Sequence, residues 1–219
     1  MPVLNDLFLE HLGASLARQK TLLRATEGLP CNIDLTAGRI SFGERHTFPV
    51  QLLGREDETG TWTWGWALPG IPEPLLRAAR DLESYGRQNG LDAFQVPSFR
   101  DEALGSDELA VLACGISGSD SFFIARTEEG LLFLLIPDLG GQIRRDTSVR
   151  FAAEVIAEML QTYELRNPRP ALKAYLRSEG YEIDETSPGQ WTARHPRGSR
   201  ITLKFDSRGR LAKLDGSDG

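Results

Sequence analysis

The chain of 219 residues is 40% hydrophobic and 26% charged, which is ordinary for one large globular domain, or for one domain with a small appendage. Its net charge of −6 is uneven: residues 1–168 hold 15 basic and 24 acidic side chains, a balance of −9, and residues 169–219 hold 10 and 7, a balance of +3. This acidic main body argues against nucleic acid as a partner. The sequence has no long apolar run and no secretory signal, and Cys31 and Cys114 match no disulfide framework. These features predict a cytoplasmic protein that does not span a membrane.

The first segment of the chain predicts a helix followed by strands. Leucines at helical spacing predict an amphipathic helix over 4–27, which Asn5 or Asp6 caps and Gly28 ends. Alternating apolar residues then predict strands at 31–35, 39–42 and 46–53. Together with the next strand, at 61–67, we expect these segments to form a four-stranded antiparallel meander.

The strand at 61–67 carries three of the four tryptophans, Trp62, Trp64 and Trp66. Successive side chains of a strand point to opposite faces, so the three indoles would share one face. We expect this face to be covered by the helix at 4–27 or by a second helix at 72–88, with Gln51 as a hydrogen-bond partner for an indole N–H. Trp66, at the end of the strand, should be the least buried of the three.

The middle of the chain predicts three helices and a hairpin. The helices lie at 72–88, at 106–116 with Ser106 as the cap, and at 148–163. Strands at 121–127 and 131–137 form the hairpin. The second of these strands is apolar without alternation, so we expect both its faces to be covered.

The sequence Asn167-Pro168-Arg169-Pro170 marks the clearest boundary, and it divides the chain into a main α+β domain at 1–166 and a small α+β unit at 167–219. This unit is predicted to hold a helix and four strands, at 171–178, 181–184, 190–195, 200–205 and 210–214. Residues 217–219 should fray. The predicted fold class is therefore α+β, an antiparallel sheet (meander plus hairpin) packed with helices and followed by a helix with antiparallel hairpins.

Few residues have the type and spacing of a catalytic, metal or phosphate site. Gly115-Ile116-Ser117-Gly118 is out of register for a serine-hydrolase elbow. Three histidines and two cysteines are dispersed, so we expect no metal and no cofactor, and no catalytic residue is predicted. Arg144 and Arg145, beside Gly140-Gly141, could hold an anion, although an ordinary charged loop explains them as well.

The tryptophan motif allows two interpretations. Trp62, Trp64 and Trp66 could form a core, or they could form a partly open aromatic wall that receives a ligand or a partner chain. With Arg144 and Arg145 they are the residues that we predict to bind a ligand or a partner.

The chain resembles a bacterial family of unknown function. The resemblance rests on Phe48–Gly54, on the Trp-x-Trp-x-Trp-Ala motif at Trp62–Ala67, on Leu132–Leu135 and on Phe205–Leu211. Leu68 stands where similar sequences often have Asn. The family implies no activity. Its members resemble small bacterial proteins that are found near toxin and immunity loci.

Three functions remain open. The first is a non-enzymatic protein-binding protein, of the immunity kind, which would use its acidic surface, including Glu56–Glu58, against a partner. The second is a small-ligand-binding protein or an enzyme with a pocket between the tryptophan strand and the loop that carries Arg144. The third is a structural or assembly protein that forms a homodimer.

Overall fold

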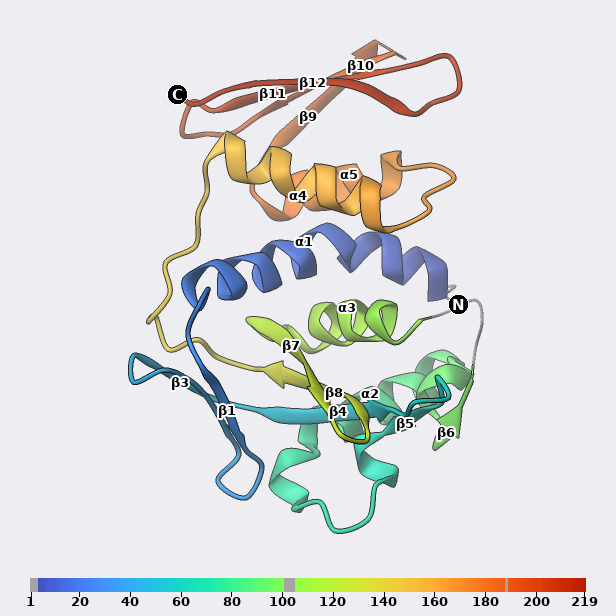
Figure 1. The fold of residues 1–219 in the computed structure, drawn as a ribbon. Helices are drawn as coiled ribbons and strands as arrows, with labels where there is room; N and C mark the ends of the chain where they lie inside the picture. The colour runs from blue at the N-terminus through green and yellow to red at the C-terminus, as the bar shows by residue number, and fades with distance from the viewer. Residues whose placement is uncertain (1–3, 101–104, 188) are drawn as a thin grey trace.

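The fold places helices between two antiparallel sheets (Figure 1). The computed structural model describes residues 4–100, 105–187 and 189–219. Its α-helices are α1 (Leu4–Ala25), α2 (Arg77–Asn89), α3 (Ser106–Ser117), α4 (Val149–Thr162) and α5 (Arg169–Ser178). Its strands are β1 (Cys31–Asp34), β2 (Arg39–Phe42), β3 (His46–Pro49), β4 (Gln51–Glu56), β5 (Trp62–Trp64), β6 (Ser98–Phe99), β7 (Ser121–Thr127), β8 (Gly130–Ile136), β9 (Glu182–Ser187), β10 (Gln190–Arg194), β11 (Arg200–Phe205) and β12 (Leu211–Ser217). The predicted class, mixed α+β with antiparallel sheets, is confirmed.

A five-stranded sheet with the order β6-β5-β4-β8-β7 forms the base of the molecule. Side chains of β8 alternate between two hydrophobic clusters: Phe133 and Leu135 join the larger one, and Leu134 and Ile136 join the smaller one. Both faces of β8 are therefore covered, which confirms the prediction from its continuous apolar run.

The predicted four-stranded meander is wrong, because the chain changes sheets at Val50. β3 pairs with β2 in a separate three-stranded sheet, whereas β4 pairs with β5 and β8. Pro49 ends the first ladder, since proline has no N–H to donate. The Val50 N–H turns to the Gly38 carbonyl oxygen, 3.0 Å away. The strand predicted at 46–53 is therefore two strands.

The tryptophan strand is shorter than predicted. β5 ends at Trp64, and Gly65–Ala67 form the 3₁₀ helix η1, so Trp66 does not continue the stripe. At Gly65 a Cβ atom would lie 2.6 Å from the Leu52 carbonyl oxygen, a distance that no side chain tolerates. Because Gly65 has no side chain, the chain can leave the sheet here while its backbone remains in contact with β4.

Helix α1 is covered on two sides. It packs on α3 and β7 toward the five-stranded sheet, and on α4 and α5 toward the C-terminal strands (Figure 1). Leu12 and Leu22 are completely buried. At Gly13 a Cβ atom would lie 2.4 Å from Cβ of Tyr175, so the absence of a side chain there permits the close approach of α5.

The C-terminal residues pack on the main body. The sheet β12-β11-β10-β9 and α5 contribute Trp191 and Leu172 to the same hydrophobic cluster that contains Leu12 of α1. The division into 1–166 and 167–219 stays a prediction about chain organisation. The two segments share one hydrophobic cluster, which is what a unit near the lower size limit for independent folding needs.

The ends of several helices and strands differ from the prediction. Gly105, not Ser106, is the N-cap of α3, and the Ser106 hydroxyl donates to the Glu56 carboxylate instead. The end of the chain is held in place: β12 extends to Ser217, and the Asp218 carboxylate accepts the Val149 N–H of α4 at 2.9 Å. The predicted helix at 72–88 is divided into the 3₁₀ helix η2 (Glu73–Leu75) and α2. The 3₁₀ helix η3 (Asp92–Phe94) and the strand β6 were not predicted.

We predict that Trp64→Ala lowers the free energy of unfolding by about 3–5 kcal/mol, because it empties a fully buried indole site between β5 and η3. Chemical denaturation followed by circular dichroism measures the loss. An unchanged denaturation midpoint would show that this indole is not part of the core.

Candidate functional site

The tryptophans of β5 belong to the core. Trp62 is 3% exposed and Trp64 is fully buried. The Trp64 indole N–H donates to the Ala93 carbonyl oxygen at 2.9 Å, and its ring meets Phe94 edge-on with centroids 5.6 Å apart. Gln51 is therefore not the partner of this indole. The Trp62 ring similarly meets Phe133, at 5.0 Å.

Trp66 is the partly exposed member of the three, as predicted. The Arg80 guanidinium lies 5.9 Å from the centre of its ring, within cation–π range. The Nε1 atoms of Trp66 and Trp62 are buried and have no hydrogen-bond partner among the described residues.

The two arginines predicted for the site lie in another part of the fold. Arg144 is exposed in the loop between β8 and α4. Arg145 forms an ion pair with Glu179 at the end of α5. The structure therefore links Arg145 to the C-terminal unit, whereas the tryptophans pack beneath α2 and η3.

A cleft of about 370 Å³ lies between α2 and the end of α3, and we call it the α2–α3 cleft. Its lining residues are Gln51, Arg77, Ala78, Asp81, Leu82, Tyr85, Ile116, Ser117, Ser119 and Pro137. None of the five residues predicted for binding is among them. The volume is within the range of small-molecule sites, roughly 300–1,000 Å³.

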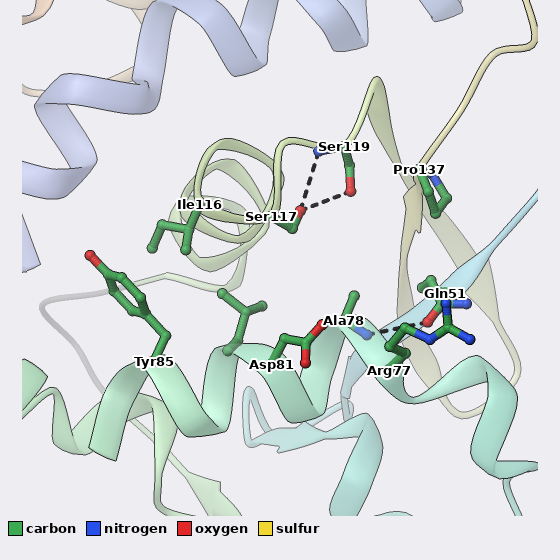
Figure 2. Close-up of a pocket in the computed structure, with 10 residues that line it drawn as sticks. Gln51, Arg77, Ala78, Asp81, Tyr85, Ile116, Ser117, Ser119 and Pro137 are labelled. Atoms are coloured by element: carbon green, nitrogen blue, oxygen red, sulfur yellow. Dashed lines mark hydrogen bonds between the residues drawn. The ribbon is translucent and has the colours of Figure 1, made fainter. Parts of the chain in front are cut away.

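One wall of the cleft is a single face of α2. Arg77, Ala78, Asp81, Leu82 and Tyr85 follow the helical spacing that puts residues one turn apart on the same side. Figure 2 shows Tyr85 near one end of the cleft and Arg77 near the other. Leu82 is buried, whereas Ala78 and Tyr85 are only partly covered, so this face is part core and part open surface.

The opposite wall is the end of α3 and the turn that follows. Gly118 adopts the left-handed conformation (φ 68°) that closes the helix, and this places Ser117 and Ser119 on the cleft side. Their hydroxyl oxygens lie 2.8 Å apart, so each serine is the hydrogen-bond partner of the other. The wall therefore presents a pair of hydroxyl groups that is already ordered.

Gln51 joins the strand β4 to the start of α2. Its Oε1 atom accepts the Ala78 N–H at 3.2 Å, and its Nε2 atom donates to the Pro74 carbonyl oxygen at 3.0 Å. The N-cap residue of α2, Leu76, makes no side-chain cap. Gln51 therefore caps α2 from the neighbouring strand and fixes the helix on the sheet.

Arg77 and Asp81 are the charged side chains of the cleft. Both are exposed, and neither forms a hydrogen bond or ion pair with another described residue. Other arginines of α2 are engaged: Arg80 contacts Glu73 and Glu83, and Arg87 contacts Glu83. The charges of the cleft are thus available to a ligand.

The residues around the cleft supply no activated nucleophile. The lining contains no histidine, cysteine or lysine. Burial raises the pKa of the nearby Cys114 thiol to about 11, and its Sγ atom donates to the Ser119 carbonyl oxygen, so this thiol stays protonated and inert. Among the described residues, no cluster of histidine, cysteine, aspartate or glutamate has the arrangement of a metal site.

The sequence pattern did not predict the cleft. Ala78, Leu82 and Tyr85 fit a buried helical stripe, and the sequence does not show that α3 leaves part of that stripe open. A usable signal was the spacing of Arg77 and Asp81, which puts two charges beside the apolar face of one helix.

The comparisons with known proteins point to one family. A family model described as "Family of unknown function (DUF6882)" matches residues 5–139, a segment that contains every residue lining the cleft. No curated protein and no solved structure matches the chain significantly. Within the residues that the structure describes, no helix is long and apolar enough to cross a membrane.

We predict that Gln51→Ala lowers the free energy of unfolding by about 0.5–2 kcal/mol, the range for a lost helix cap. The substitution leaves the Ala78 N–H and the Pro74 carbonyl without their partner. Urea denaturation of Gln51→Ala and of the control Gln142→Ala checks this, since Gln142 makes a single contact from an exposed loop. Equal losses in both variants would contradict the capping role.

Proposed function

The chain belongs to the DUF6882 family of unknown function, and we propose that it is a binding protein that holds a small molecule in the α2–α3 cleft. One observation carries the proposal: a largely apolar cleft of about 370 Å³ has two charged side chains among its lining residues, and neither forms an ion pair with a described residue. Small-molecule sites combine these features, a mostly apolar wall and a few polar groups that fix orientation.

The proposed role is binding rather than catalysis. The Ser117 and Ser119 hydroxyls are bonded to each other and not to a base. The Gln51 amide already bonds the backbone at Val50, Pro74 and Ala78, and it contacts no nucleophile among the described residues. The cleft therefore offers recognition groups, whereas the pairing of nucleophile and base that acyl transfer needs is not found among its lining residues.

A substitution that fills the cleft tests the proposal. We predict that Ser117→Tyr abolishes binding of small polar fragments, because the exposed Ser117 side chain stands on the wall opposite α2. Ligand-observed NMR with a chemically diverse fragment library measures binding to both proteins. Ser207→Tyr, the same change at an exposed turn between β11 and β12, should bind as the wild type does. Fragments that bind Ser117→Tyr equally well, or no fragment binding to the wild type, would refute the proposal.

Protein binding is the second candidate, and the grouping of two acidic turns favours it. Glu56 ends β4, the β4–β5 loop carries Asp57 and Glu58, and the β7–β8 turn carries Glu128 and Glu129. β4 pairs with β8, with Glu56 opposite Leu131, so the two turns are neighbours at one end of the sheet. Glu129 is paired with Arg55, and the other four acidic side chains would attract a basic partner.

The same end of the sheet also includes the start of α3. Burial and the nearby Glu56 carboxylate raise the pKa of Asp107, which is the effect expected where negative charges gather. We propose that this surface binds a partner protein in the bacterial cytoplasm, in the manner of an immunity protein. Free thiols at both Cys31 and Cys114 agree with a reducing compartment.

For this candidate we predict that Glu58→Lys/Glu128→Lys abolishes capture of a basic partner from native lysate. Both side chains are exposed, so the double variant should fold normally. The control is Glu27→Lys/Glu44→Lys, which makes the same change in net charge at other exposed positions. The result supports partner binding by the acidic surface only if capture weakens with salt, is lost in the first variant and persists in the control. Equal capture by the wild type and both variants contradicts partner binding by this surface.

A further inference from the structure

The charges of the α2–α3 cleft are balanced. Its lining holds one cation, Arg77, and one anion, Asp81, and the remaining lining side chains are neutral. A ligand with a single charge would pair with one of these groups and meet the other as a like charge. A ligand that carries both charges would pair with each.

The spacing of the two charges limits the size of the ligand head group. Arg77 and Asp81 are four residues apart on α2, which is about 6 Å along the helix axis. Their side chains do not pair with each other, although residues at this spacing are neighbours on a helix surface. The complementary ligand therefore carries its two charges only a few bonds apart.

Asp81 orients such a head group. It points from α2 into the space beneath Ser117, the last residue of α3 (Figure 2). Its carboxylate makes this side of the cleft negative, so this side favours the cationic group. The anionic group then lies toward Arg77, whose guanidinium is suited to a carboxylate.

The Arg18 guanidinium neutralises carbonyl groups at the end of α3, so these groups add no negative charge to the cleft. It donates to the carbonyl oxygens of Cys114 and Ser119, at 3.4 and 3.0 Å, from the side of α1. Asp81 is therefore the main anionic group in the cleft itself.

The far end of the cleft is apolar. Figure 2 shows Tyr85 and Ile116 at the end away from Arg77, and the buried Leu82 lies on the same helix face as Tyr85. Apolar area at this end favours a hydrocarbon or aromatic substituent on the ligand.

We propose that the α2–α3 cleft binds a free amino acid with an apolar side chain. Its carboxylate contacts Arg77, its ammonium group contacts Asp81, and its side chain lies against Tyr85 and Ile116. This inference rests on the proposed function of the cleft, and it adds the chemical class of the ligand.

The experiment compares three forms of each probe. Isothermal titration calorimetry with the full chain uses leucine, isoleucine, valine, methionine, phenylalanine, tyrosine and tryptophan, together with the amide and the N-acetyl derivative of each. The amide lacks the negative charge, and the N-acetyl derivative lacks the positive one. At least one free amino acid should bind, and its two derivatives should bind about tenfold more weakly or worse, as expected when a charge-assisted contact is lost.

Two variants identify the contacts. Arg77→Gln should weaken binding of the free amino acid about tenfold and leave the amide unaffected, and Asp81→Asn should do the same for the free amino acid while it spares the N-acetyl derivative. Arg87→Gln, on the same helix but paired with Glu83, is the matched control. Thermal denaturation confirms that all three variants fold.

The outcomes separate this inference from the proposed function. If fragments bind and Ser117→Tyr blocks them, but no free amino acid binds or a singly charged derivative binds equally well, the ligand class is wrong and the small-molecule site stands. If neither fragments nor amino acids bind the wild type, both proposals fail.

Discussion

The position of α1 between two layers is the constraint on which the rest of the structure depends. One side of the helix meets α3 and β7, and the other meets α4 and α5. Such a helix needs apolar residues around most of its surface, together with a small residue where another backbone comes close. Leu12 and Ala17, which lie about 140° apart around the helix axis, supply the first, and Gly13 supplies the second, where Tyr175 occupies the space of a side chain. Through α1, the five-stranded sheet and the C-terminal sheet become parts of one core.

Glycines set the geometry on the other side of α1. At Gly54 a Cβ atom would lie 2.5 Å from Cζ2 of Trp62, so the indole rests directly on the backbone of β4. Gly65 similarly permits contact with the Leu52 carbonyl oxygen, which lets the chain leave the sheet after Trp64. These two contacts position the following segment, and Gln51 then holds the start of α2 on β4, beside the cleft.

Long periodic patterns made much of the fold predictable. The apolar run of β8 indicated a strand covered on both faces, and the stripes of α1, α2 and α4 indicated their helices. Prediction failed where a local pattern continued but tertiary contacts changed the backbone. Alternation runs through Val50 although the chain changes sheets there, and Trp66 continues the tryptophan spacing although Gly65 has ended the strand. The charges of Arg77 and Asp81 beside an apolar face could be found in the sequence, but the cleft they line could not, because its walls come from residues as far apart in sequence as Gln51 and Pro137.

The placement of α1 also has a consequence for synthesis of the chain. Helix α1 is synthesised before α4 and α5, the helices that cover its second side, which end at Thr162 and Ser178. The growing chain therefore exposes an apolar helix face until α4 and α5 have been made. Native contacts of such large sequence separation fold slowly, and exposed apolar surface promotes aggregation. Translation products that end before α4 and α5 leave this face uncovered, so we expect them to aggregate more readily than the full chain.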